Sequence, residues 1–392
     1  MTQQGRIHHL QQIVRDRRLS GAILFYSRDT YYYSGTAQPA YLVVLPDDFR
    51  LFVRRGFDIA VTESGLENGK IAEEKSLERI AQIMFPGSGT GEKVGTELDM
   101  LTVNQARSFT SALGERDLVD ISNDILAQRM IKDESEITSI RKACRAVHAG
   151  HEAAVSCLRA GMHELELSAR IEAAHRLAGH EGCFFIRQND FVMSRGPLAS
   201  GRNLLATSGT LYTLCGAGLS PAIPTGASMR AIERGDLVMV DIPTCVEGYH
   251  ADQARTYAVE QASGEAVEMF ERLRAVADRL VNGIRPGVSC GDAFGMAEEC
   301  ASKQGIGDSF MRMHSGGKVH FIGHGIGLEV NEPPVLAKKS STILSPNMVV
   351  TIELHLVDQT GVAMKIEDSV LLGTDRNEIL TMSPRKLAVI SI

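Results

Sequence analysis

The segment VHFIGHGIGLEVNEPP, residues 319–334, sets two histidines, His320 and His324, four positions apart in a glycine-rich stretch. Glycine stands on both sides of His324, and a residue without a side chain lets the backbone approach another group closely. Asn331 follows, just before an acid and two prolines. A histidine held this closely is typical of a metal ligand or a proton-transfer group. We therefore expect the rest of the chain to supply its partners.

The size, charge and hydropathy of the chain narrow the classes of protein to which it can belong. Its 392 residues are too many for one ordinary core and predict two domains. A net charge of -7 argues against a nucleic-acid-binding protein. Neither a membrane-length apolar run nor a signal-peptide pattern occurs, so we expect a cytoplasmic protein with no membrane contact. The seven cysteines form no C-x-x-C pair, which predicts free thiols.

The pattern of apolar and polar residues predicts an α/β domain at residues 1–124 and a second domain at 125–392. In the first, short apolar strands alternate with amphipathic helices, and a hairpin is expected where Pro46-Asp47-Asp48 separates two apolar runs. The second begins with two long helices, 134–161 and 163–182, each expected to end at a glycine. Strands are expected at 347–358 and 362–372.

Four acids stand in segments that otherwise have the composition of buried strands. These are Asp241 in GDLVMVDIPT, Asp252 in GYHADQARTY, Glu353 in MVVTIELHLV and Glu367 in MKIEDSVLL. A carboxylate is costly to bury without a partner, and several close together cannot all ionise unless a cation neutralises them. Each acid taken alone fits a strand end or the surface. Together with His324 they predict a metal site.

The motifs VDI, GYHADQARTY, HFIGHGIGLEVNEPP, VVTIE and KIEDSV, in this order, resemble those of the pita-bread metallopeptidases, which include aminopeptidase P, prolidase and creatinase. The resemblance covers nearly the whole chain. It implies a mixed α/β (α+β) fold, with an N-terminal domain of the creatinase and prolidase type and a C-terminal pita-bread domain. It also implies a homodimer.

The resemblance implies five ligand residues that hold two divalent metal ions. Asp241 would bind one ion, His324 and Glu353 the other, and Asp252 and Glu367 would bridge the two. Four carboxylates and one imidazole suit Mn²⁺ or Co²⁺, with Zn²⁺ and Fe²⁺ as alternatives.

The implied chemistry is hydrolysis by a water molecule that the two ions activate. Paired metal ions lower the pKa of a bridging water, and the resulting hydroxide would attack a polarised carbonyl. Glu353 would carry the proton as general base and acid. His320 matches a family histidine that contacts the substrate and stabilises the tetrahedral intermediate. A buried structural histidine is the alternative interpretation of His320.

The chain departs from the family pattern around the predicted metal ligands. Asn331 stands where relatives usually carry histidine, and residues 220–241 lack the usual Pro-His pair. Lys365 replaces an arginine, and Leu354-His355 replaces a Pro-Gly pair. Asn331 cannot carry a proton near neutral pH. We assign Asn331 and Lys365 to substrate binding.

Three functional hypotheses follow. The first is an Xaa-Pro peptidase, of the aminopeptidase P or dipeptidase kind, that acts on short peptides. The second is a relative that acts on a non-peptide small molecule by C–N hydrolysis or elimination, as the altered surroundings would allow. The third is a binding module without catalysis. A serine hydrolase is not favoured, because the G-x-S-x-G match at Ser289 lies between two helical segments and predicts a helix N-cap instead.

Overall fold

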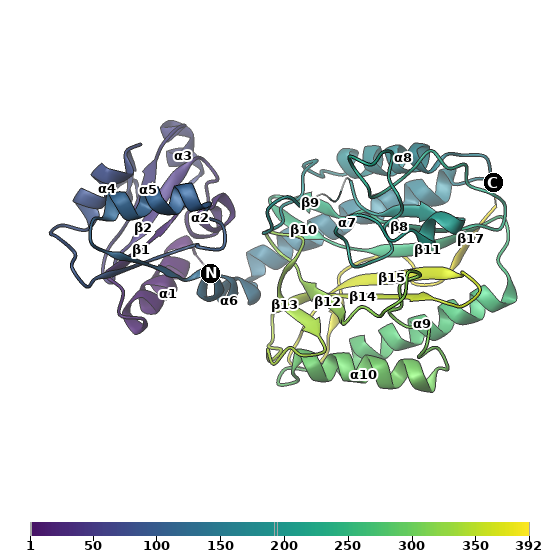
Figure 1. Cartoon of the computed structure of the whole chain (residues 1–392). Helices are drawn as coiled ribbons and strands as arrows, with labels where there is room; N and C mark the ends of the chain where they lie inside the picture. Colours follow the sequence, from purple (N-terminus) through teal and green to yellow (C-terminus); the bar gives the residue numbers. More distant parts are fainter. Residues whose placement is uncertain (1, 192, 194, 392) are drawn as a thin grey trace. The chain divides into compact units, whose positions relative to one another are not determined.

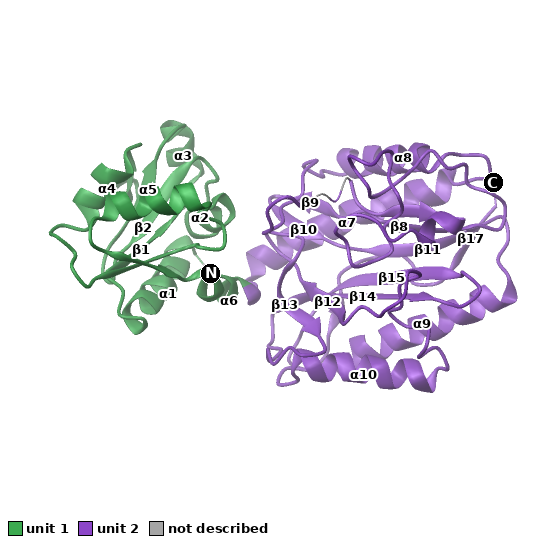
Figure 2. Cartoon of the chain, in the orientation of Figure 1, with its two compact units in different colours: residues 1–129 green, residues 130–392 purple. Residues whose placement is uncertain are grey.

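The computed structural model describes residues 2–191, 193 and 195–391. The chain divides into two compact units, Met1–Arg129 and Met130–Ile392 (Figure 2). The predicted boundary at residue 124 lies inside helix α6 (Ser122–Met130). The division between the two units falls near the end of this helix, after Arg129.

The N-terminal unit is a six-stranded mixed sheet covered by helices. The strand order is β4-β3-β2-β1-β5-β6. Its strands are β1 (Gly21–Leu24), β2 (Ala40–Val44), β3 (Phe49–Val53), β4 (Ile71–Glu73), β5 (Lys93–Thr96) and β6 (Asp117–Asp120). Its helices are α1 (Gln3–Asp16), α2 (Ser27–Ser34), α3 (Phe57–Glu63), α4 (Leu77–Met84) and α5 (Val103–Leu113), followed by α6. The predicted hairpin is confirmed, since β2 and β3 pair antiparallel with Val44 opposite Phe49.

Helices α7 (Glu134–Cys157) and α8 (Glu164–Leu177) open the C-terminal unit. Asp133 caps α7, because its side chain accepts from the backbone of Glu136 while the Glu136 side chain accepts from the backbone N–H of Asp133. Both helices end before the glycines expected to close them. Leu158, in an extended conformation, already terminates α7.

Two sheets lie between pairs of helices in this unit. Figure 1 shows α7 and α8 on one side of the strands, with α9 (Gly264–Gly283) and α10 (Cys290–Lys303) on the other. The four-stranded sheet has the order β17-β11-β8-β7, and the five-stranded sheet has the order β13-β12-β14-β15-β16. Ser289 caps α10 by accepting from the backbone N–H of Asp292 at 3.0 Å, which confirms the predicted N-cap.

The strands of the four-stranded sheet and its neighbouring hairpin are β7 (Leu198–Ser200), β8 (Leu237–Asp241), β9 (Thr244–Val246), β10 (Tyr249–Ala251), β11 (Ala254–Val259) and β17 (Ala388–Ile390). Those of the five-stranded sheet are β12 (Phe321–Gly325), β13 (Glu332–Ala337), β14 (Val349–Val357), β15 (Ala363–Leu371) and β16 (Glu378–Ile379). The mixed α/β fold with two domains is therefore confirmed.

A buried arginine on β11 ties the two sheets and the C-terminal segment together. The guanidinium of Arg255 donates to the backbone carbonyl of Glu367 at 2.6 Å and to the carboxylate of Asp368 at 2.6 Å. It also donates to the carbonyls of Ser383 and Pro384, each at 2.9 Å. Five rigid N–H donors suit one arginine to such a junction.

All seven cysteines are free thiols, as predicted. None of the helices in the described part of the chain is long and apolar enough to cross a membrane.

Candidate metal centre

Asp241 and Asp252 are brought together by the pairing of β8 with β11. Asp241 ends β8 and lies opposite Ala254, the first residue of β11, while Asp252 precedes β11 by two positions. The hairpin β9–β10 occupies the chain between them. The backbone of Asp252 is fixed by Ser369, whose hydroxyl accepts from its N–H at 3.2 Å and donates to its carbonyl at 2.9 Å. Both acids are buried.

Glu353 on β14 lies directly opposite Glu367 on β15. Like charges at opposite positions of an antiparallel pair repel one another. Both side chains are nevertheless buried, and Glu367 is fully enclosed. Such an arrangement requires a cation or a proton to offset the repulsion.

His324 lies on β12, whose two flanking glycines are needed for close strand packing. A Cβ on Gly323 would lie 2.0 Å from the carbonyl oxygen of Thr351, and one on Gly325 would lie 2.2 Å from that of Pro333. The glycines therefore allow neighbouring backbone to approach the strand that carries His324. His324 Nδ1 lies 3.0 Å from the carbonyl oxygen of Gly325. Donation to this carbonyl leaves Nε2 with a free lone pair for a metal ion.

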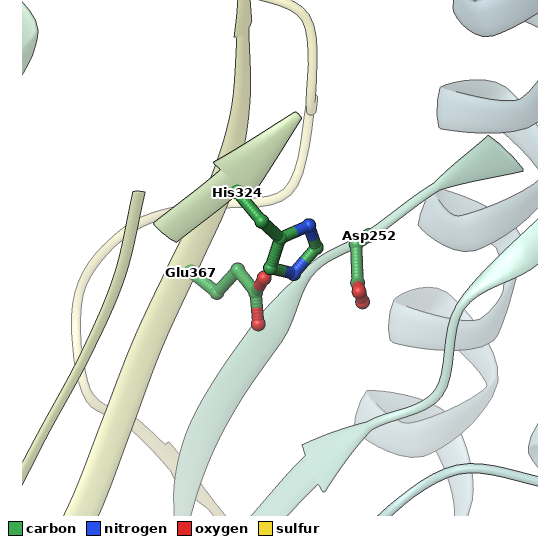
Figure 3. A group of neighbouring side chains, drawn as sticks. All are labelled: Asp252, His324 and Glu367. Carbon is green, nitrogen blue, oxygen red and sulfur yellow. The ribbon is translucent and has the colours of Figure 1, made fainter. Parts of the chain in front are cut away.

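Three of the five predicted ligands converge on one point. Asp252, His324 and Glu367 each offer a ligand atom, and these atoms all lie within 4.8 Å of one another (Figure 3). Both carboxylate oxygens of Glu367 are buried without a hydrogen-bond partner. Unsatisfied buried oxygens beside an imidazole nitrogen fit a divalent metal ion, which would replace the missing partners.

Burial and mutual repulsion act on the protonation of these acids. Burial, followed by the charge of Asp241, raises the pKa of Asp252 well above its usual value. Burial and the charge of Asp252 do the same to the pKa of Glu367. Although burial opposes ionisation of Glu353 too, the charges of Lys365 and His324 hold its pKa below the usual value. Without a bound cation, Asp252 and Glu367 are thus the acids most strongly driven to take up protons.

Lys365 lies inside the cluster, with a side chain that is only 1% exposed. Its Nζ donates to Asp241 Oδ2 at 2.5 Å and to Glu353 Oε2 at 2.9 Å. Glu367 Oε2 is 3.1 Å away in ionic contact, though without the angles of a hydrogen bond. Burial alone would lower the pKa of Lys365, but Asp241, Glu353 and Glu367 raise it well above its usual value.

The two remaining predicted site residues, His320 and Asn331, are exposed to solvent, whereas the cluster itself is buried. His355, opposite Lys365 across β14 and β15, is fully buried, and neither of its ring nitrogens has a hydrogen-bond partner. Sequence reasoning missed the inward direction of Lys365 and His355. The signal was present, because alternate residues of a strand share a face and these two precede or follow the glutamates by two positions.

Comparison with known proteins assigns both units to described families. Residues 138–374 match metallopeptidase family M24, and residues 6–131 match the creatinase/prolidase N-terminal domain. A protein of Pyrococcus furiosus named Xaa-Pro dipeptidase is 26% identical over 386 residues, which cover 97% of this chain and 99% of the relative. The solved structure of an Xaa-Pro dipeptidase from Bacillus anthracis superposes with a TM-score of 0.83 at 25% identity, covering 99% of this chain and all of the other. A prolidase structure from Pyrococcus furiosus gives 0.78 at 26% identity, covering 96% of this chain and all of the other.

Proposed function

Because this chain belongs to metallopeptidase family M24, we propose that it hydrolyses short peptides at the bond before a proline. The observation that carries the proposal is the convergence of Asp252, His324 and Glu367 within 4.8 Å of one another. The alignment with the relative named Xaa-Pro dipeptidase covers nearly the full length of both chains. That relative's name supports the proposed specificity for proline.

The proposed cofactor is a pair of divalent metal ions, Mn²⁺ or Co²⁺, held by Asp241, Asp252, His324, Glu353 and Glu367. Four oxygen donors and one imidazole favour ions of this hardness over softer ones. When bound, such ions would supply an activated water and polarise the scissile carbonyl.

The protein groups would supply proton transfer and substrate positioning. Glu353 is ionised beside Lys365 and can accept a proton from the nucleophile, then return it to the departing amine. His320 is exposed and would donate to the carbonyl oxygen as negative charge develops there. Asn331 is also exposed and would orient the peptide through its amide group.

Hydrolysis of defined peptides tests the proposal. Metal-reconstituted protein would be assayed against Xaa-Pro dipeptides and longer Xaa-Pro peptides, with matched Xaa-Ala peptides as controls. We expect release of the residue before proline and little cleavage of the controls. Absence of turnover of every peptide, with metal bound, would contradict the proposal.

A second candidate is a relative that cleaves or eliminates a C–N bond in a non-peptide small molecule. The asparagine at 331 favours it, because a neutral amide replaces a family histidine near the expected substrate position. Turnover of cyclic or N-alkylated amino-acid amides in the absence of Xaa-Pro cleavage would favour this candidate.

We also propose a homodimer, on the resemblance to the pita-bread metallopeptidases alone. Light scattering at several protein concentrations tests it, and a monomer at all of them would exclude any site completed by a partner subunit.

A further inference from the structure

We infer that His250 is a positioning residue that fixes Asp252 against His324 and also holds the segment that carries Asn331. The inference rests on the metal centre of the proposed function and concerns a residue outside the proposed ligand set. It does not depend on which substrate the protein cleaves.

Asp252 and His324 come from segments that belong to different sheets. Asp252 follows β10, which pairs with β9, whereas His324 lies on β12, which pairs with β13 and β14. The ligand atoms of the two residues nevertheless lie within 4.8 Å of one another (Figure 3). Since none of these ladders joins β10 to β12, contacts outside the ladders must fix the separation of the two side chains.

His250 supplies such a contact. It stands two positions before Asp252, and Gly327 stands three positions after His324. The backbone N–H of His250 donates to the carbonyl oxygen of Gly327 at 2.8 Å, and Nδ1 of the ring lies 2.9 Å from the same oxygen. Because a carbonyl oxygen only accepts, Nδ1 carries a proton and donates. Two donors from one residue therefore tie the end of β10 to the segment that follows β12.

The acceptor residue Gly327 is itself closely packed. A Cβ on Gly327 would lie 2.8 Å from Glu332 Oε2. This carboxylate is buried and accepts a hydrogen bond from Lys132 Nζ at 3.1 Å. The N–H of Gly327 donates to the carbonyl of Glu329 at 3.1 Å. The oxygen that His250 contacts is therefore a firm anchor.

The other ring nitrogen of His250 holds a third segment. Phe185 donates its backbone N–H to Nε2 at 3.2 Å, and its carbonyl accepts from the N–H of Val330 at 2.8 Å. Val330 directly precedes Asn331. The rings of Phe184 and Phe185 pack against the imidazole, with centroids 6.4 and 5.9 Å away. One buried side chain thus connects the approach to Asp252 with the approach to Asn331.

The two ring nitrogens have different partners, so two substitutions can separate their roles. An asparagine places its amide where Nδ1 lies and can still donate to Gly327. A glutamine reaches the position of Nε2, and its carbonyl oxygen can accept from Phe185. His250→Asn therefore keeps the tie to the segment after β12, and His250→Gln keeps the tie to Phe185.

Titration of the metal-free proteins with Mn²⁺, followed by calorimetry, tests the first tie without any substrate. His250→Gln should raise the dissociation constant by at least about tenfold, as expected for a residue that orients metal ligands. His250→Asn should change it by less than about threefold. The matched control is His163→Gln, because Nδ1 of His163 also contacts a backbone carbonyl, that of Met229, at 2.8 Å. This control should leave the dissociation constant unchanged.

Hydrogen exchange followed by mass spectrometry tests the second tie, again without substrate. His250→Asn should speed exchange of the backbone amides in residues 184–187 by at least about tenfold, whereas His250→Gln should not. On an Xaa-Pro peptide, His250→Asn should raise KM by about three- to tenfold, equivalent to one lost hydrogen bond, with a smaller change in kcat.

Equal Mn²⁺ affinities in the two His250 variants would overturn the inference, as would an equal loss of affinity in His163→Gln. If His250→Gln does not fold, His250→Asn decides: faster exchange around Phe185 with unchanged Mn²⁺ affinity supports the inference, and any other result overturns it. A protein that gives the expected pattern but cleaves no peptide keeps the inference and removes the proposed function. A protein that cleaves Xaa-Pro peptides while both variants bind Mn²⁺ like the wild type does the reverse.

Discussion

The ammonium nitrogen of Lys365 lies 2.5 Å from Asp241 Oδ2, although the two residues are 124 positions apart in the chain. The contact joins β15 of the five-stranded sheet to β8 of the four-stranded sheet. Both sheets must therefore be assembled before the acids have their neighbours.

Removing Asp252 should abolish metal-dependent activity while leaving the metal-free protein intact. Asp252→Ala deletes a proposed bridging ligand, so we expect hydrolysis to fall by more than about 100-fold, beyond the usual cost of losing an outer partner. Because burial and the charge of Asp241 raise the pKa of Asp252, the metal-free variant should unfold at no lower temperature than the wild type. Elemental analysis and thermal melts with and without Mn²⁺ check both parts.

The exposed Asp47 provides the control, since Asp47→Ala should keep activity and metal content. If Mn²⁺ raised the melting temperature of Asp252→Ala as much as that of the wild type, Asp252 would not be a ligand.

Restoring the family histidine at position 331 should raise turnover. One positioned donor near a developing oxyanion is worth on the order of 10²–10³ in rate. We expect Asn331→His to increase turnover of an Xaa-Pro peptide by about tenfold, equivalent to about 1.4 kcal/mol of barrier. Steady-state kinetics measures it, with the exposed Asn104→His as the control. A loss of activity on the best substrate would instead favour the non-peptide candidate.

Breaking the Arg255 junction should destabilise the C-terminal unit. Arg255→Met removes the guanidinium from the buried carboxylate of Asp368, 2.6 Å away. The expected loss is about 3 kcal/mol in the free energy of unfolding, the low end for a buried pair, because Arg385 still contacts Asp368. Urea denaturation measures it.

The exposed pair Lys303–Glu299 provides the comparison, and Lys303→Met should cost no more than about 0.5 kcal/mol. Equal losses in the two variants would contradict the role given to Arg255.

Stability should fall in mild acid because of His175. Burial, and then the nearby His180, lower the pKa of His175 from 6.5 to about 4. Between these values the unfolded chain binds a proton that the folded chain does not. The free energy of unfolding therefore decreases as pH falls from about 6.5 to about 4, by about 3 kcal/mol.

Urea denaturation across this pH range checks the expectation. His175→Leu should flatten the acid side of the profile, whereas the exposed His9→Leu should not. Glu172, Arg176 and His180 line the same cavity and stay in both proteins, so the difference between the two profiles isolates His175. If the two variants had identical profiles of stability against pH, His175 would be excluded as the cause of the loss of stability in acid.

Much of the candidate metal centre could be predicted from sequence, because carboxylates stand out in apolar strands. Asp241 and Glu353 are recognisable in this way, and the structure shows that both accept a hydrogen bond from Lys365. The conformation of Lys365 could not be predicted from composition, since a lysine on a strand more often faces solvent. The alternation of side chains along β15 predicts the face of the strand on which Lys365 lies. The contact of Lys365 with Asp241 depends on how closely β8 approaches β15, which the sequence does not show.

The end of helix α7 could not be predicted from the position of a glycine alone. Gly161 was expected to end α7, yet the extended conformation at Leu158 ends it earlier. A glycine after a helical pattern marks where a helix can stop, whereas tertiary packing decides where it does stop.

The hydrogen bonds from Arg255 to the carbonyls of Ser383 and Pro384 have a consequence for protein synthesis. These two residues follow all five proposed metal ligands in the chain. A product that ends between Asp368 and Ser383 would therefore contain every proposed ligand and still lack the acceptors that hold Arg255 beside Glu367 and Asp368. We expect such a truncated product to lack stably bound metal.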